Sequence, residues 1–403
     1  MVSRRFRQFV FWLHSWLGLH IFLILGVIFL SGTLLVFVEE LDAGLDADRR
    51  IDPPVSQRSA SFGQLYDGAR AAHPQADILS LSRGHVSWIA DKALIRTGPG
   101  RRATVWLHPG TGVATGTSGQ TDIRRIIFEF HSSFLTEHRL GNLLMTAFSL
   151  PLLLFIVTGL ITYRRFWKGF FRLPSRQTGA RGWWGGMHRL VMLWALPFLI
   201  VMGLTSGYYL IGALGQGPKD PVHDIAPVTA RDALLPAGFD GQALDRAVAV
   251  AMETLPGLIP ETISLPKRPK EAIAVIGPGS AVLTGPEGQG VYVDPVSLAA
   301  LGRFRSADYG LGHRLNQIND EMHFGLWGGF GSRLLWFVLG LASTFAMAAG
   351  AMIYAAKVAA PDPAAAMPGA ARRIWQGMSA LKWVLPLFVL AVLVVALLRF
   401  GPL

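Results

Sequence analysis

The sequence predicts a mainly α-helical membrane protein, with a four-helix core made of two tandem repeats, a fifth C-terminal helix and two small α+β units outside the membrane. Of the 403 residues, 51% are hydrophobic and only 16% are charged, whereas about a quarter are charged in soluble domains. The apolar residues are gathered in long runs, which is typical of polytopic membrane proteins. The order of apolar runs and polar segments in the first half of the chain also recurs in the second half.

Five apolar runs are long enough to be considered as membrane spans. They cover residues 9–38, 140–163, 187–213, 331–356 and 381–398. The first has about 30 apolar-rich residues, at least twice the apolar length of a signal peptide, and it lacks a small-residue cleavage site, so we expect an uncleaved anchor. The last is the least typical span, because it is short and interrupted by Pro386.

The runs divide the chain into consecutive segments. In order, they are a first span (1–38), a first extracytoplasmic unit (39–125), a second span with an extension outside the membrane (126–163), a cytoplasmic loop (164–186), a third span (187–213), a second extracytoplasmic unit (214–330), a fourth span (331–356), a second cytoplasmic loop (357–380) and a fifth helix (381–398).

The distribution of charge predicts the orientation of the spans. The formal net charge is +11, and residues 1–8, 164–186 and 357–382 carry a cluster of Arg and Lys against a single acid, Asp362. The long polar segments have mixed charge and hold most of the acids. This is the positive-inside pattern, so we expect a cytoplasmic N-terminus in a bacterial inner membrane, with the lipid bilayer rather than nucleic acid as the partner of the basic residues.

The residue types exclude several kinds of chemistry. The chain has no cysteine, which rules out disulfides, zinc–thiolate sites and iron–sulfur clusters. No glycine-rich loop follows a strand and opens a helix, and no Walker sequence or nucleophile elbow is present, so nucleotide binding and hydrolysis are poorly supported. Metal or redox chemistry must therefore use histidine, methionine, carboxylates or a bound cofactor.

The two halves of the chain match in detail. HSWLGLHIFLILGVIFLSG (14–32) corresponds to HRLVMLWALPFLIVMGLTSG (188–207), and GNLLMTAFSLPLLLFIVTGLITY (141–163) corresponds to GSRLLWFVLGLASTFAMAAGAMIY (331–354). Each polar segment between them has one amphipathic helix and alternating stretches that are typical of β-hairpins. Each is thus expected to be one helix packed on an antiparallel sheet, in a parallel duplication.

Several of these motifs resemble a known family. The hairpin from Tyr292 to Pro295 is similar to the PepSY domain pattern, and His108 in WLHPGTG takes the place of its usual Asp. With HSWLGL (14–19), FHSSFL (130–135), MHRL (187–190) and MHFGLWGG (322–329), the chain resembles the PepSY-associated transmembrane family over roughly residues 5–360. The resemblance implies two PepSY-like units, and a likeness to periplasmic-facing haem-containing reductases, several of which act on iron bound to siderophores. Some longer relatives carry a cytoplasmic flavoprotein domain, and the 403 residues contain none. The electron donor is therefore expected to be a separate molecule: a cytoplasmic flavoprotein reductase or a quinol.

Four histidines occupy equivalent positions in the repeats. His14 and His188 lie early in the first and third spans, near the cytoplasmic face, whereas His131 and His323 precede the second and fourth spans, near the outer face. A helix bundle builds cofactor sites from inward-facing side chains, and haem iron accepts two axial imidazoles. We therefore expect two b haems, an inner one between His14 and His188 and an outer one between His131 and His323. Seven glycines are expected to leave room for the macrocycles: Gly18, Gly26, Gly32, Gly159, Gly203, Gly207 and Gly350.

Other histidines and three arginines are secondary candidates for the sites. His20 aligns with Trp194 and has no partner in the repeat; His138 and His313 are alternatives near the outer face. Haem propionates are anionic and Arg binds carboxylates in a bidentate manner, so contacts to propionates are expected at the following positions: Arg139, Arg189 and Arg333. Positive-inside anchoring explains Arg189 equally well.

The sequence thus predicts an inner-membrane di-haem b protein that carries electrons from the cytoplasmic side to a periplasmic acceptor, such as a ferric siderophore. This would make it a ferric-chelate reductase. The alternative is a non-enzymatic, membrane-anchored PepSY module that binds or regulates another protein; a third hypothesis is a structural subunit of a transporter.

Overall fold

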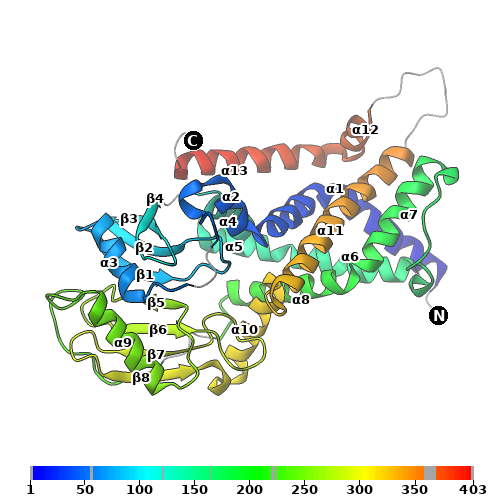
Figure 1. The fold of residues 1–403 in the computed structure, drawn as a ribbon. Coiled ribbons are helices and arrows are strands. Elements are labelled where there is room, and N and C mark those ends of the chain that lie inside the picture. Colours follow the sequence, from blue (N-terminus) through cyan, green and yellow to red (C-terminus); the bar gives the residue numbers. More distant parts are fainter. Residues whose placement is uncertain are drawn as a thin grey trace. The chain divides into compact units, whose positions relative to one another are not determined.

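The structure is a computed structural model that describes residues 3–54, 58–119, 122–163, 165–218, 223, 225–357 and 369–400 (Figure 1). The chain divides into two compact units. The helical unit comprises Met1–Phe37, Ile126–Gly217 and Met322–Leu403, and the sheet unit comprises Val38–Arg125 and Pro218–Glu321. Each unit is formed by segments from both halves of the sequence.

The helical unit contains the apolar runs. Its helices are α1 (Arg4–Leu35), α5 (His138–Ala147), α6 (Ser149–Thr162), α7 (Gly179–Trp194), α8 (Leu196–Ala213), α11 (Gly329–Lys357), α12 (Ala370–Gly377) and α13 (Val384–Phe400), with most of α4 (Ile123–Ser133) and the end of α10 (Leu311–Phe324). Four segments are long and apolar enough to cross a membrane: Arg4–Leu35, His138–Thr162, Leu196–Ala213 and Gly329–Lys357. Ala370–Gly377 and Leu381–Val395 add a fifth span if the two helices, bent by 115°, are taken together.

Two predicted spans are interrupted helices. The run at 140–163 breaks at Phe148, between α5 and α6, and the run at 187–213 breaks at Ala195, between α7 and α8. Pro151 and Pro197 lie in the first turns after these breaks, where a residue without an N–H group is tolerated. The helix α7 begins at Gly179, so its first two turns lie in the segment that was expected to be a loop.

The helices pack through small residues and large apolar ones. α1 lies along α11 and α6, α11 along α7, and α8 along α5 and α6 (Figure 1). Phe29, Phe198 and Trp336 meet in the core of the bundle. At Gly340 of α11, a Cβ atom would collide with Thr33 of α1, so this glycine allows the two longest helices to approach closely.

The sheet unit contains one continuous antiparallel sheet of eight strands, in the order β4-β3-β2-β1-β5-β6-β7-β8. The strands are β1 (Asp77–Ser82), β2 (Asp91–Gly98), β3 (Arg101–Leu107), β4 (Ala114–Ser118), β5 (Thr262–Ser264), β6 (Ile273–Gly277), β7 (Gln289–Val293) and β8 (Ala300–Arg305). The first four come from the first polar segment and the last four from the second. The two units expected from the sequence are therefore joined, because β1 pairs with β5 through Ser80↔Ser264, Leu81↔Ile263 and Ser82↔Thr262.

Two helices, α3 (Phe62–Ala72) and α9 (Gly241–Thr254), share one core with this sheet (Figure 1). Leu65 and Leu244, one from each helix, are fully buried with alternating strand residues such as Ile95 and Val275. Alternation of this kind places one face of every strand in the core. The short helix α2 (Val38–Leu45) follows α1 in sequence and opens this unit.

Candidate functional site

The histidines expected at the inner site face each other within the helical unit. His14 is on α1 and His188 is on α7, and their ring centroids are 6.5 Å apart with the ring planes at 77°. Phe155 of α6 packs against the edge of the His14 ring, with 5.2 Å between centroids. Residues 174 positions apart in the sequence are thus brought together.

The histidines expected at the outer site form a second pair of equal spacing. His131 near the end of α4 and His323 near the end of α10 have ring centroids 6.5 Å apart and ring planes at 42°. Tyr209 of α8 packs edge-on against His323, with 5.2 Å between centroids. Both pairs therefore combine one histidine from each half of the chain.

All four rings are anchored by a hydrogen bond at Nδ1. Nδ1 of His188 lies 2.7 Å from the carbonyl oxygen of Ala346. The other three bonds go to helix hydroxyls: His14 to Thr158 Oγ1 (2.8 Å), His131 to Ser31 Oγ (3.0 Å) and His323 to Thr205 Oγ1 (2.8 Å). Each anchor comes from another helix, so each ring is fixed in orientation by its neighbour.

These anchors also favour one tautomer of the rings. A carbonyl only accepts, so Nδ1 of His188 must carry the proton. Thr158, Thr205 and Ser31 each donate their single hydroxyl proton to a carbonyl of their own helix, at Leu154, Val201 and Ile28. A hydroxyl whose proton is on the backbone carbonyl is an acceptor for the imidazole, so these three contacts favour the tautomer that His188 has, with the proton on Nδ1. Nε2 is left with a free lone pair, which is the form of histidine that binds metals.

The spacing of the pairs suits one metal atom between two imidazoles. A bond from a metal to an imidazole nitrogen is about 2.0 Å, which places the centroids of two opposed rings on one metal about 6 Å apart. The measured separation of 6.5 Å in both pairs is close to this value. Among the described residues, no group of three or more His, Asp or Glu side chains is placed to hold a metal ion. Two imidazoles are the number of protein ligands that a haem iron accepts, because the macrocycle supplies the others.

Glycines lie directly against three of the rings. A Cβ atom on Gly159 would stand 3.6 Å from Cε1 of His14, and one on Gly350 would stand 3.4 Å from Cε1 of His188. At Gly32 a Cβ atom would come within 2.7 Å of Cε1 of His131, so only glycine seats this ring without displacing it. Gly32 therefore makes room for an imidazole, whereas a side chain at Gly159 or Gly350 would be in ordinary van der Waals contact with its ring; room for a macrocycle beside these glycines remains a prediction.

A buried hydroxyl group lies beside a glycine of α8. The hydroxyl of Ser149 is buried and has no hydrogen-bond partner among the described residues. It faces Gly207, where a Cβ atom would stand 4.0 Å from Ser149 Oγ. A buried hydroxyl without a hydrogen-bond partner, next to a glycine, is a feature of sites that hold a further group or a water molecule.

The three arginines expected to bind propionates lie in different surroundings. Arg139 is exposed, at the start of α5. Arg189 lies over the ring of Tyr163, with 5.9 Å from Cζ to the centroid. Arg333 donates to the carbonyl of Val36 from Nε (3.1 Å) and Nη2 (2.6 Å), so it caps the C-terminal end of α1. Contacts to propionates remain predictions for all three.

The alternative histidines have other surroundings. His20 bonds to the carbonyl of Trp16 at 2.6 Å and stacks on the indole of the same residue. His138 is the exposed first residue of α5. His313 packs beside Tyr309 in the sheet unit, with 5.8 Å between the ring centroids.

The residues that anchor the rings were not predicted from the sequence. Three of the four anchors are Ser31, Thr158 and Thr205, which are hydroxyl residues inside apolar spans. The signal for them is a small hydroxyl residue beside a glycine: Ser31-Gly32, Thr158-Gly159 and, after Thr205, Ser206-Gly207. The carbonyl of Ala346 has no such signal, because every residue has one.

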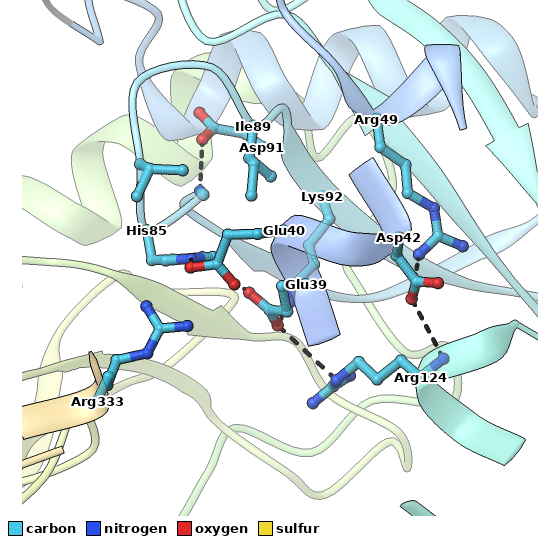
Figure 2. Close-up of polar contacts among 12 residues, drawn as sticks. Glu39, Glu40, Asp42, Arg49, His85, Ile89, Asp91, Lys92, Arg124 and Arg333 are labelled. Carbon is cyan, nitrogen blue, oxygen red and sulfur yellow. Dashed lines mark hydrogen bonds and ion pairs between the residues drawn. The ribbon is translucent and has the colours of Figure 1, made fainter. Parts of the chain in front are cut away.

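The sheet unit contains a cluster of charged side chains around His85 (Figure 2). Nδ1 of His85 lies 2.9 Å from Glu39 and Nε2 lies 2.9 Å from Glu40, while Lys92 and Arg124 approach Glu39 at 3.2 and 3.8 Å. The hydrogen bonds to Glu39 and then Glu40 raise the pKa of His85 to about 9. The bond from His85, with the nearby cations, holds the pKa of Glu39 below its ordinary value. With both nitrogens bonded, His85 ties α2 to the β1–β2 connection and has no nitrogen left for a substrate.

Comparisons with known proteins bear on the whole chain. The sequence model of a family described as "PepSY-associated TM region" matches residues 11–357. A stretch of 145 residues is 27% identical to Uncharacterized protein PA4219 of Pseudomonas aeruginosa. This stretch covers 31% of the chain and 34% of that protein, so the chain spans about a third of the length of the curated relative it matches.

Proposed function

Because the chain belongs to the family of PepSY-associated transmembrane proteins, we propose a function that its two histidine pairs would perform inside a membrane. The proposal is a di-haem b electron-transfer protein that reduces an extracytoplasmic acceptor, in the first place a ferric siderophore, with electrons from the cytoplasmic side. The observation that carries it is the repeated pair: two imidazoles 6.5 Å apart, all four anchored at Nδ1.

His14 with His188, and His131 with His323, would hold the haems through Nε2. A bound haem b at each pair would supply a one-electron iron couple. The residues of the chain would orient the ligands: the anchors at Ser31, Thr158, Thr205 and Ala346 would hold the rings with Nε2 free for the iron.

The reaction would move one electron for each ferric ion reduced. A cytoplasmic flavoprotein reductase or a membrane quinol would supply the electrons, and a quinol that gives up two electrons and two protons would serve two ferric ions. The product Fe(II) is held less tightly than Fe(III) by a chelator with hard oxygen ligands, so reduction would release the iron.

We further propose that the chain is a tandem duplication in the inner membrane, with the N-terminus in the cytoplasm and the sheet unit in the periplasm. The distribution of basic residues supports this orientation. The sheet order supports the duplication: β1–β4 with α3 and β5–β8 with α9 would be the two PepSY-like halves.

The test is the visible spectrum of the full-length protein, purified in detergent from haem-replete cells. We expect a Soret band, a sharp α band after dithionite reduction, and two haems for each chain. His14→Ala and His188→Ala should each remove the same spectral component, and His131→Ala and His323→Ala should remove the other.

His20→Ala and His138→Ala are the matched controls and should keep both components, because neither ring belongs to a pair. A colourless wild-type protein would refute the proposal and favour the non-enzymatic binding module. Loss of one and the same component in His14→Ala and His131→Ala would show that the pairing is wrong.

A further inference from the structure

A polar pocket lies at the end of the helical unit that carries the basic loop between α6 and α7. Its volume is about 220 Å³, and its polar lining consists of Tyr163, Arg172, Ser175, Thr178 and Arg189. Neither guanidinium forms an ion pair with a carboxylate of the described residues. The pocket therefore presents two positive charges and three hydroxyl groups with no internal anion to balance them.

Close packing of the loop on α7 builds this pocket. A Cβ atom on Gly182 would collide with Thr178, and one on Gly186 would stand 2.5 Å from Cβ of Pro174. A Cβ atom on Gly169 would likewise stand 2.5 Å from the hydroxyl of Tyr163. The loop thus packs against two glycines of α7, Gly182 and Gly186, while Gly169 of the loop packs against Tyr163, and these contacts position the lining of the pocket.

An apolar groove continues from the polar pocket. Its volume is about 520 Å³, and it runs from Phe170 and Trp194 to Val338 and Ala342 of α11. Leu173 and Leu190 line both cavities, so the groove and the pocket adjoin each other. Phe171 and Leu173, at its edge, are 86% and 79% exposed in the protein alone. In a chain that spans a membrane, apolar side chains exposed in this way are suited to contact with lipid acyl chains.

We propose that the pocket and the groove together form a binding site for one anionic phospholipid. The phosphodiester lies in the pocket against Arg172 and Arg189, and an acyl chain lies in the groove along Trp194 and α11. The charge favours an anionic lipid over a zwitterionic one, because two arginines face the phosphate and no carboxylate receives a cationic headgroup. The site adjoins His188 through Arg189, and it requires only the membrane location, not the haems.

The test compares lipids on the full-length protein. Detergent-purified protein is titrated with phosphatidylglycerol or phosphatidylcholine, and the bound lipid is counted by native mass spectrometry. We expect one tightly held phosphatidylglycerol, and a loss of affinity of about tenfold or more in Arg172→Gln/Arg189→Gln. The matched control, Arg181→Gln, removes a charge from the same region outside the pocket and should change the affinity less than twofold.

The groove is tested by filling it. Ala342→Trp should weaken phosphatidylglycerol binding and leave the pocket's affinity for inorganic phosphate unchanged. Equal losses in Arg181→Gln and in the double variant would overturn the proposal, since they would indicate a diffuse surface charge. Full binding in Ala342→Trp would also overturn it, because the pocket would then hold a soluble anion. The proposal would also be overturned if Arg172→Gln/Arg189→Gln kept its bound lipid but shifted the haem spectrum, because the arginines would then bind a propionate.

Discussion

His85 lies between two carboxylates, and it donates to Glu39 from Nδ1 and to Glu40 from Nε2. Only the protonated ring can donate from both nitrogens, and the contacts raise its pKa to about 9 from an unfolded value near 6.5. Because the folded pKa is the higher one, the stabilisation is complete below pH 6.5 and is lost as the pH rises toward 9.

We therefore expect the wild-type protein to lose about 1–2 kcal/mol between these pH values relative to His85→Gln. This free energy is smaller than the pKa shift of His85 alone would give, because solvent screens the charges of side chains that are about a third exposed. Thermal unfolding of both proteins from pH 6 to pH 9.5 measures the difference. An equal pH dependence in both proteins would contradict the prediction.

Individual site residues differed in how well the sequence predicted them. A histidine at a membrane-span end is rare, and four in repeated positions predict a pairing that the fold then brings together, although their binding of haem remains a prediction. The hydroxyl anchors were missed because Ser and Thr in an apolar helix usually bond to their own backbone, which Thr158 and Thr205 also do. Only three-dimensional contact shows that the same oxygen has a second partner.

At the scale of elements, the apolar runs predicted the spans but not their interruptions. Run length and hydropathy do not show whether a proline kinks a helix or ends it; Pro151 and Pro197 follow single-residue interruptions at Phe148 and Ala195, where the backbone angles stay in the helical region. Likewise, the alternation of apolar residues predicted hairpins in both polar segments. It carried no information on the pairing of β1 with β5, since any exposed strand edge can accept another strand.

The contact between α3 and α9 is reciprocal. The N–H group of Gly63 donates to Asp245 (2.7 Å) and that of Gly241 donates to Asp67 (2.8 Å). A Cβ atom on either glycine would collide with the carbonyl oxygen of the other. The sequence signal is the repeated Gly-Gln-x-x-Asp at residues 63–67 and 241–245.

This contact makes Gly63→Ala and Asp245→Ala destabilising. The methyl group would push the helices apart, and the lost carboxylate would leave the Gly63 N–H without its acceptor; each costs about 1–3 kcal/mol. The apparent midpoint of thermal unfolding should fall by about 2–4 °C per kcal/mol in a unit of this size. Gln242→Ala, an exposed neighbour on α9, is the control, and a similar fall in this variant would argue against the reciprocal contact.

At the scale of the whole molecule, each unit is made from both halves of the chain. The helical unit takes three segments and the sheet unit takes two. Each histidine pair likewise joins a residue before position 140 to one after position 180, and the sheet joins four strands from each half. Because each unit is built from segments of both halves of the chain, we expect neither half to be stable by itself.

The orientation proposed from the basic segments can be tested with single cysteines, because the natural chain has none. We expect Gln177→Cys, in the basic loop before α7, to be shielded from an impermeant maleimide in intact spheroplasts and labelled after lysis. Thr97→Cys on β2 and Gln242→Cys on α9 should be labelled before lysis. All three positions are exposed and uncharged, so the substitutions leave the charge distribution unchanged. Labelling of Gln177→Cys in intact spheroplasts, with protection of the other two, would reverse the orientation and with it the direction of electron flow proposed for the histidine pairs.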